Sequence, residues 1–297
     1  MKPWLKWTAA GVGTLVLLLV LAIAAGLQLF DRKRTRTVAV NVKAVPYATD
    51  PQSLARGKYL FESRGCVDCH GANGAGRDFV KTDSVQLRGA NITSAGVVAN
   101  YKPEDWVRII RHGVKPNGQP AMVMPSEDYN RFTDQDLASL VAYTRSLAPV
   151  TGGEAVIKLP LPARVMYGFG AIPDAAERIN HTLPPAQPIP EAVNAKHGAY
   201  VANMCIGCHG EHLSGGKIAG GPPDWPAAAN ITPGEGSAMK NYKDSAQFVA
   251  MLRSGKRPDG TPIKVMPFDS LSKMNDVDAQ ALYEFLKTVP PRAAGNK

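Results

Sequence analysis

The sequence contains one five-residue signature twice, first at Cys66 and again at Cys205. Together the two copies hold all four cysteines of the 297-residue chain. The spacing C-x-x-C-H is typical of covalent attachment of a c-type haem, in which the cysteines form thioethers and the histidine binds the iron. The sequence therefore predicts two covalently bound haem c groups. The predicted attachment residues are Cys66, Cys69 and His70 in the first signature, and Cys205, Cys208 and His209 in the second.

Other roles for paired cysteines fit the pattern less well. A redox-active C-x-x-C pair is expected in a βαβ context, and no alternation of strand and helix patterns surrounds either signature. A structural zinc site would need a fourth ligand at suitable spacing, and no further cysteine exists. Two structural disulfides would account for the cysteines but not for the histidine after each pair. We therefore interpret both signatures as haem attachment sites.

Three further pairs of matching residues follow the signatures in the same order. The first pair has the same separation as the signatures, and the other two pairs are separated by three positions more. A domain of about a hundred residues has therefore been duplicated, with three residues inserted inside one copy. The pairs are Asn91 and Asn230, which begin Asn-Ile-Thr, Arg111 and Arg253, which begin Arg-x-Gly, and Met124 and Met266, each followed by proline.

The repeated unit resembles class I c-type cytochromes, small helical domains in which the signature histidine and a distant methionine bind the iron from opposite faces. The resemblance implies that His70 and Met124 are the ligands of the first haem, and His209 and Met266 those of the second. A thioether sulfur favours reduced iron, so His/Met ligation raises the reduction potential relative to a site with two histidines. Proline after each methionine fits a loop that presents the sulfur without forming a helix.

Two residues compete for the first axial site. Met122 could replace Met124, but the second unit has Lys264 at the equivalent position. His112 could also bind iron, yet Ser254 is its counterpart in the second unit. We therefore expect Met124 to be the ligand, and His112 to lie at the surface or beside the site.

The spacing of apolar residues predicts that both units are helical. Thr133 and Asn275 are good N-caps, each followed by acidic residues that favour the first turn of a helix. We expect an all-α fold without a substantial sheet, composed of two tandem cytochrome c domains after a single N-terminal transmembrane helix. Further helices are expected at residues 53–64, 103–111 and 196–204.

Residues 8–30 carry no charge and are rich in Leu, Val and Ala. As a helix they would be about 35 Å long, enough to cross a bilayer. A cleavable signal peptide is the alternative, because Ala22-Ile23-Ala24 resembles a cleavage site. Trp4 and Trp7 suit a membrane interface, and the apolar run is long for a signal, so we expect an uncleaved anchor.

The orientation of this anchor involves a conflict. A basic cluster follows the span, and the positive-inside rule alone would keep it in the cytoplasm. The resemblance implies the opposite, since haem is attached to such cytochromes outside the bacterial cytoplasmic membrane. We therefore expect a single-pass inner-membrane protein with both haem domains in the periplasm and the cluster near lipid headgroups. The cluster comprises Arg32, Lys33, Arg34 and Arg36.

Charge and proline content complete the expected organisation. Of the net charge of +9, residues 1–49 contribute +6, which makes nucleic-acid binding a poor interpretation. The proline-rich residues 149–192 predict an extended connector whose apolar middle, 165–170, packs on the haem domains or docks on a partner or membrane. We assign 1–31 as the anchor or signal peptide, 32–49 as a periplasmic linker, 50–148 as cytochrome c domain 1, 149–192 as the connector, and 193–297 as cytochrome c domain 2.

The Leu-Pro-rich connector resembles the one in the cytochrome subunit of bacterial membrane-bound alcohol and gluconate dehydrogenases. We expect an electron carrier, not an enzyme, that links a dehydrogenase or quinol-oxidising complex to a terminal oxidase. The alternative is a permanent cytochrome subunit of a dehydrogenase or of a haem-copper oxidase. A dihaem peroxidase or thiosulfate-oxidising enzyme would need an open or unusual sixth iron position, and both units offer Met-Pro.

Overall fold

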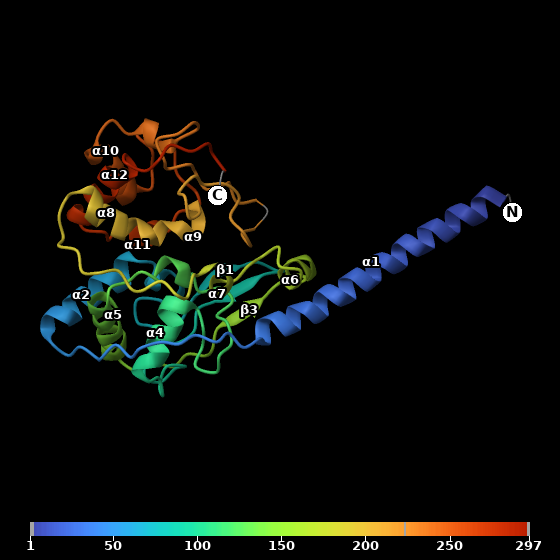
Figure 1. Cartoon of the computed structure of the whole chain (residues 1–297), viewed down its shortest axis with the longest axis horizontal. Helices are drawn as coiled ribbons and strands as arrows, with labels where there is room; N and C mark the ends of the chain where they lie inside the picture. The colour runs from blue at the N-terminus through green and yellow to red at the C-terminus, as the bar shows by residue number, and fades with distance from the viewer. Residues whose placement is uncertain (1–2, 223, 296–297) are drawn as a thin grey trace.

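The computed structural model describes residues 3–222 and 224–295. A long N-terminal helix projects from a globular part that consists of two stacked halves, one for each repeated unit (Figure 1). This helix, α1 (Pro3–Thr35), is long and apolar enough to cross a membrane. The expected mostly helical fold, with two cytochrome-like domains after a long N-terminal helix, is confirmed.

The first half is organised by two helices that cross at a glycine. α2 packs against α5, and a Cβ on Gly57 of α2 would lie 1.9 Å from the carbonyl oxygen of Ser139 in α5. Leu60, Phe61 and Leu137 are almost fully buried in the core around this crossing. The elements are α2 (Pro51–Ser63), α3 (Cys66–His70), β1 (Asp78–Lys81), β2 (Gln86–Arg88), α4 (Pro103–His112), η1 (Ser126–Asp128) and α5 (Asp134–Ser146).

The second half repeats this arrangement. α8 packs against α12, and a Cβ on Gly198 of α8 would lie 1.9 Å from the carbonyl oxygen of Ala281 in α12. Leu252 and Leu286 are buried in its core. The elements are α8 (Ala195–Ala202), η2 (Asn203–Cys205), α9 (Ile206–His209), η3 (Ala238–Asn241), α10 (Ser245–Ser254), α11 (Phe268–Leu271) and α12 (Asp276–Leu286).

Both N-caps predicted from the sequence are confirmed. The Thr133 hydroxyl accepts a hydrogen bond from the backbone N–H of Asp136, and the Asn275 side chain accepts one from the backbone N–H of Asp278. These bonds satisfy amides that the first helical turn leaves without intrahelical partners. They fix the start of the last helix of each half.

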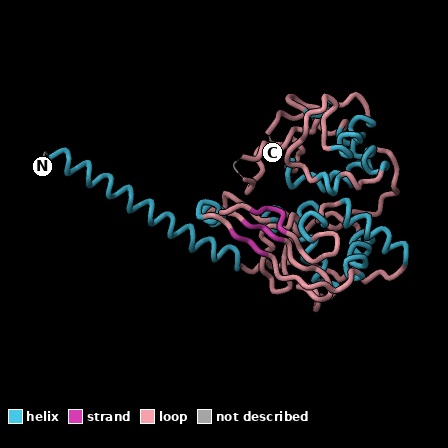
Figure 2. The backbone as a smooth tube through the Cα atoms, turned by 180° about the vertical axis from the view of Figure 1, so that it is seen from behind, coloured by secondary structure: helices cyan, strands magenta, loops and turns pink. Residues whose placement is uncertain are grey.

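A small antiparallel sheet was not expected. β1 pairs with β2, and β2 pairs with β3 (Val156–Lys158), which follows the last helix of the first half. Figure 2 shows the three strands together at the base of α1. Arg88 of β2 pairs with Val156 of β3, and because most of the first half separates the two in the chain, no local periodicity indicates the pairing.

The region between the halves is only partly extended. Residues 179–192 have no helix or strand, as the proline content predicts, but α6 (Leu161–Gly168) and α7 (Ala175–Arg178) precede them. The extended interpretation was wrong for this part, because Pro162 lies in the first turn of α6, where a missing N–H costs no hydrogen bond. α6 packs against α1.

The basic cluster after α1 divides into two pairs. Lys33 forms an ion pair of 2.8 Å with Glu177, and Arg36 binds both carboxylate oxygens of the buried Asp174 at 2.7 and 2.8 Å. These two cations therefore face protein, contrary to the expectation for the whole cluster. Arg32 and Arg34 are exposed.

Candidate functional site

The histidine of each C-x-x-C-H signature is the last residue of a short helix, and a glycine follows it. α3 begins after Gly65, with φ of 88°, and ends at Gly71, with φ of 72°. α9 ends at Gly210, with φ of 80°. Left-handed backbone is strained for residues with a Cβ, so glycine allows a sharp turn beside the signature. Residues three and four apart share a face of such a helix, which groups the cysteines and histidine of each signature.

Three of the signature thiols lack the low pKa of a reactive redox cysteine. Burial raises the pKa of Cys66, Cys69 and Cys205 to about 12, so none would be a thiolate at neutral pH. Among the described residues, no group of three or more His, Cys, Asp or Glu gathers into a metal site. The structure therefore supports neither the thioredoxin-type nor the zinc interpretation of these cysteines.

Each signature histidine is oriented through one ring nitrogen. Nδ1 of His70 lies 2.8 Å from the carbonyl oxygen of Ala90, and Nδ1 of His209 lies 2.8 Å from that of Ala229. Burial lowers the pKa of His70, which keeps its ring neutral. A neutral imidazole that donates from Nδ1 has its lone pair on Nε2, and this is the form that binds a metal.

The repeated Asn-Ile-Thr sequence fixes the carbonyl groups that orient these rings. Oδ1 of the fully buried Asn91 accepts hydrogen bonds from the backbone N–H and the hydroxyl of Thr93, at 2.9 and 2.8 Å. Asn230 and Thr232 form the same two bonds at the same distances. Because Ala90 and Ala229 directly precede these asparagines, the motif holds the carbonyl that each histidine contacts.

A second bond ties each asparagine to the chain beyond the last helix of its half. Nδ2 of Asn91 donates to the carbonyl oxygen of Val150 at 2.8 Å, and Nδ2 of Asn230 donates to that of Arg292 at 2.8 Å. Each loop therefore closes against the end of its own domain. The sequence revealed this motif as a repeat but not its role.

The two Met-Pro loops have matching geometry. The backbone N–H of Ser126 donates to the carbonyl oxygen of Met124 at 2.9 Å, and that of Phe268 donates to that of Met266 at 2.9 Å. Met124 is partly buried against the core cluster that also contacts Cys66. Met266 is partly buried against the cluster that contacts Cys205. The fold thus brings each methionine to the same apolar cluster as the first cysteine of its own signature.

Met122 differs from Met124 in its surroundings. Within residues 3–222 and 224–295, it is not among the side chains that pack against either core cluster. His112, the other competitor, has Nδ1 at 3.0 Å from Nδ1 of His181, which lies between the halves. Burial and the neighbouring His181 lower the pKa of His112 to about 4. The structure therefore gives His112 a structural partner.

These surroundings fit a covalently bound haem. A neutral imidazole fixed through Nδ1, a thioether sulfur in an apolar cluster and two protonated cysteines in the same unit form a suitable donor set. In the second half, Nδ1 of His209 has the matching contact, and Met266 and the protonated Cys205 lie against one apolar cluster. The residues that would hold the group lie on α3 and the Met-Pro loop in the first half, and on η2, α9 and the Met-Pro loop in the second.

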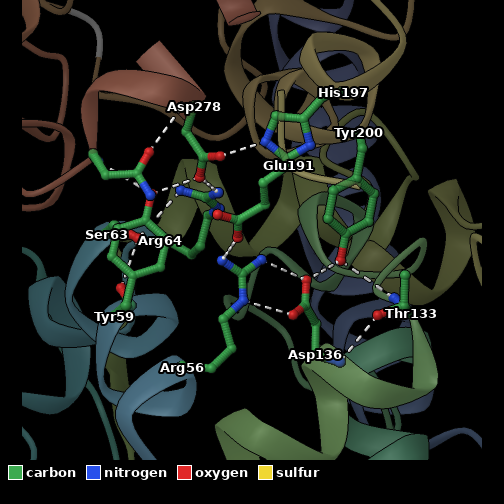
Figure 3. A network of polar contacts seen from close by, with 11 residues as sticks. Arg56, Tyr59, Ser63, Arg64, Thr133, Asp136, Glu191, His197, Tyr200 and Asp278 are labelled. Atoms are coloured by element: carbon green, nitrogen blue, oxygen red, sulfur yellow. Dashed lines mark hydrogen bonds and ion pairs between the residues drawn. The ribbon is translucent and has the colours of Figure 1, made fainter. Parts of the chain in front are cut away.

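Reciprocal hydrogen bonds join the two halves, and sequence reasoning missed them. The Tyr59 hydroxyl in α2 donates to Oδ2 of Asp278 in α12 at 2.5 Å, and the Tyr200 hydroxyl in α8 donates to Oδ2 of Asp136 in α5 at 2.6 Å (Figure 3). Each tyrosine oxygen also accepts a backbone N–H from the N-cap region of the same helix in the other half. The interface is thus pseudo-symmetric, because equivalent residues exchange equivalent bonds.

Cations complete both carboxylate sites of the interface. Arg64 and His197 bind Asp278, whose side chain is fully buried, and Arg56 binds both oxygens of Asp136 at 2.8 and 3.0 Å (Figure 3). A buried carboxylate is stable only when such partners replace its hydration. The Arg64 contact to Asp278 crosses between the halves, whereas Arg56 and His197 each lie in the same half as the carboxylate they bind.

A second reciprocal pair joins each signature to the other half's Met-Pro region. The Ser270 hydroxyl donates to Oδ2 of Asp68 at 2.7 Å, and the backbone N–H of Gly207 donates to Oδ1 of Asp128 at 2.7 Å. Asp68 and Gly207 are the third residues of the two signatures, whereas Asp128 and Ser270 each lie four residues after a candidate methionine ligand. The two attachment helices therefore both lie at the interface between the halves.

Comparison with known proteins agrees with this geometry. The sequence model of the family described as cytochrome c oxidase, cbb3-type, subunit III matches residues 52–143 and 192–286, which is more than half of the chain. The chain belongs to this cytochrome c family. Its two matches cover α2 to α5 and α8 to α12, the two halves that the fold separates.

Individual relatives of this cytochrome c are subunits of larger complexes. It is 28% identical to the fructose dehydrogenase cytochrome subunit of Gluconobacter japonicus over 85% of this chain and 57% of the relative. It is 25% identical to the gluconate 2-dehydrogenase cytochrome c subunit of Pantoea cypripedii over 81% of this chain and 60% of the relative. A cbb3-type oxidase subunit CcoP of Helicobacter pylori is 32% identical over 40% of this chain and 38% of the relative.

The cytochrome c spans a little more than half the length of these dehydrogenase relatives. The family carries covalently bound haem c and transfers electrons. This confirms the expected resemblance to cytochrome subunits of membrane-bound dehydrogenases and the expectation of an electron-transfer protein.

Proposed function

We propose that this chain is a dihaem cytochrome c that relays single electrons between a dehydrogenase and a terminal acceptor. The observation that carries the proposal is the duplicated donor set, with matching histidine, methionine and cysteine positions in both halves. Bound haem iron would supply one-electron chemistry by cycling between its ferric and ferrous forms. The protein residues supply attachment, axial ligands and an apolar environment.

His70 and Met124 would bind the iron of the first haem, and His209 and Met266 that of the second. The Nδ1 contacts to Ala90 and Ala229 support the histidines, because a ring fixed in this way presents a defined nitrogen to iron. Cys66 and Cys69, and Cys205 and Cys208, would form the thioethers. Packing of Met124 against the core favours it over Met122.

The interface between the halves supports a relay within one chain. Asp68 and Gly207, one from each signature, both bond to the other half, and each directly precedes the second cysteine of its signature. Fixed side chains at this interface would hold both donor sets in one arrangement. Electrons could then pass between the two haems without a diffusive encounter.

The proposed partners follow from the relatives. Two cytochrome subunits of dehydrogenases align over 85% and 81% of this chain, whereas the oxidase subunit aligns over 40%. We therefore place a dehydrogenase on the donor side, with this chain as its cytochrome subunit or mobile acceptor. A quinol-oxidising complex is the alternative donor, and a terminal oxidase such as the cbb3-type enzyme is the proposed acceptor.

The proposed location is the bacterial inner membrane, with α1 as a single span and both haem domains in the periplasm. The length and apolar character of α1 support the span. Attachment of haem to c-type cytochromes outside the cytoplasmic membrane, which the family resemblance implies, supports the orientation.

Ligand replacement tests the proposal in the full chain solubilised in mild detergent. Met124→Ala and Met266→Ala should each open one haem to carbon monoxide and lower its reduction potential, because a sulfur ligand favours ferrous iron. Met122→Ala, which changes a nearby methionine, should do neither. Strong carbon monoxide binding by one haem of the native protein would instead favour an enzyme.

A further inference from the structure

α6 lies against the end of the anchor helix with almost no space between the two backbones. A Cβ on Gly168 would lie 2.2 Å from the carbonyl oxygen of Gly26, and a Cβ on Gly26 would lie 2.8 Å from a side-chain carbon of Val165. The ring of the buried Tyr167 contacts Phe30 edge to face, with 5.6 Å between centroids. α6 therefore lies beside the part of α1 that contains Gly26 and Phe30.

That position lies inside the uncharged stretch of the sequence. Residues 8–30 carry no charge, and Gly26 is four residues before the end of this stretch, about 6 Å along a helix. The stretch is about 35 Å long, close to the thickness of the hydrocarbon core and its boundary. If α1 spans the bilayer, α6 lies at the depth where acyl chains meet headgroups.

Large apolar side chains of α6 and of its C-cap residue, Phe169, stay exposed although the helix packs against α1. Leu161, Met166 and Phe169 are 46%, 47% and 54% exposed, which is unusual for large side chains so close together. Arg164 lies on the same helix, with its guanidinium 5.0 Å from the centre of the Phe30 ring. Exposed apolar groups beside a cation suit a helix at a membrane interface, where lipid phosphates and acyl chains are both within reach.

Buried polar contacts hold α6 to α1. The Tyr167 hydroxyl donates to Asp174 at 2.6 Å, and Arg36, which directly follows α1, binds the same carboxylate. Lys33 of α1 donates to the carbonyl oxygen of Ile172 at 3.1 Å and lies 4.3 Å from the centre of the Tyr167 ring. Separating the two helices would remove Arg36, the cation that binds the buried carboxylate of Asp174.

We propose that α6 is a second membrane contact of this protein, with Leu161, Met166 and Phe169 inserted into the outer surface of the lipid bilayer. Contact through α1 alone would let the globular part rotate about the end of one helix. Contact through α6 as well fixes the tilt of the haem domains relative to the membrane. The proposal rests on the membrane span assigned to α1 above.

Unique cysteine labels test this in the full holo-protein in nanodiscs. The four native cysteines are proposed to be thioethers, so Met166→Cys would provide the one thiol available to a spin label. Val193→Cys is the matched control, because Val193 is an apolar residue of similar exposure, 48%, in the segment that leads to α8. Leu17→Cys, on the exposed middle of α1, reports the membrane itself.

The measurement compares how oxygen, which concentrates in lipid, and a water-soluble nickel complex relax each label. We expect oxygen to dominate at positions 17 and 166 and the nickel complex to dominate at 193. Lipid exposure at 17 with water exposure at 166 would overturn the role of α6 alone. Protection of 166 from both reagents would show that protein covers α6, which also overturns it. Water exposure at 17 would remove the span, and the proposal with it.

Discussion

The hydroxyl of Tyr59 in the first half donates a 2.5 Å hydrogen bond to the buried carboxylate of Asp278 in the second. The equivalent tyrosine of the second half, Tyr200, forms the same bond with Asp136 of the first. In this interface between the two copies of the duplicated domain, residues at equivalent positions form equivalent bonds. Tyr59, Asp278, Tyr200 and Asp136 thus join the two halves through two equivalent hydrogen bonds.

Tyr59→Phe and Tyr200→Phe should each destabilise the interface by about 1–3 kcal/mol, because each leaves a buried charged acceptor short of one hydrogen bond. Denaturant unfolding followed by circular dichroism measures this loss. Tyr143→Phe is the control, since no hydrogen bond of its hydroxyl is found among the described residues. Equal losses in all three variants would contradict a special role for the interface tyrosines.

Acid should weaken the same interface. Burial alone would raise the pKa of Asp278, but Arg64 and hydrogen bonds from Tyr59 and His197 outweigh it and lower the pKa to about 2. An unfolded aspartate has a pKa of about 3.9, so this stabilisation is complete above that pH and is lost as the pH falls toward about 2.

Between pH 6 and pH 3, the native protein should therefore lose about 1 kcal/mol of unfolding free energy that Asp278→Asn does not lose. Guanidinium unfolding at several pH values provides the comparison. Asp83→Asn, which changes an exposed carboxyl in the turn between β1 and β2, should keep the native pH dependence. An Asp278→Asn variant with the native pH dependence would refute the assignment.

Loosening the Asn-Ile-Thr turns should affect one haem at a time. Asn91→Ala removes the acceptor of two bonds from Thr93 and the bond to Val150, which frees the Ala90 carbonyl that orients His70. We expect a loss of about 1–3 kcal/mol in stability and a shift in the potential of the first haem only. Asn230→Ala should shift only the second. Spectropotentiometric titration resolves the two, and identical shifts in both variants would argue against separate sites.

Replacing the glycine at either helix crossing with alanine should destabilise the protein. A Cβ at Gly57 or Gly198 would lie 1.9 Å from a backbone carbonyl oxygen, so Gly57→Ala and Gly198→Ala must push two helices apart. The cost should be about 2 kcal/mol, more than alanine gains from helix propensity. Gly153→Ala, where no atom lies within 4 Å, should be tolerated in thermal unfolding. Tolerance at 57 and 198 would show that the crossings can relax.

Local sequence patterns identified the features that depend on neighbours in the chain. The N-caps at Thr133 and Asn275 were predictable because a cap bonds to a residue three positions away. The two cytochrome units were predictable because their motifs repeat in order. Both follow from sequence spacing alone.

Features that join distant segments were not predictable. β3 pairs with β2 across most of a domain, and Tyr59 meets Asp278 across 219 residues. Neither contact leaves a periodic trace in the sequence. The prediction of an extended connector was wrong for a different reason. Proline is tolerated in the first turn of a helix, and Pro162 lies in the first turn of α6. Lys33 and Arg36 looked like solvated cations because their acidic partners lie far away in the chain.

The central claim is that each half of the chain holds its own haem. Intact-mass spectrometry of the native holo-protein should show two covalently attached haems. The double variant Cys66→Ala, Cys69→Ala and the double variant Cys205→Ala, Cys208→Ala should each retain one, and the remaining haem should keep the potential it has in the native protein. A single haem on the native chain, or loss of both haems from either double variant, would contradict the account.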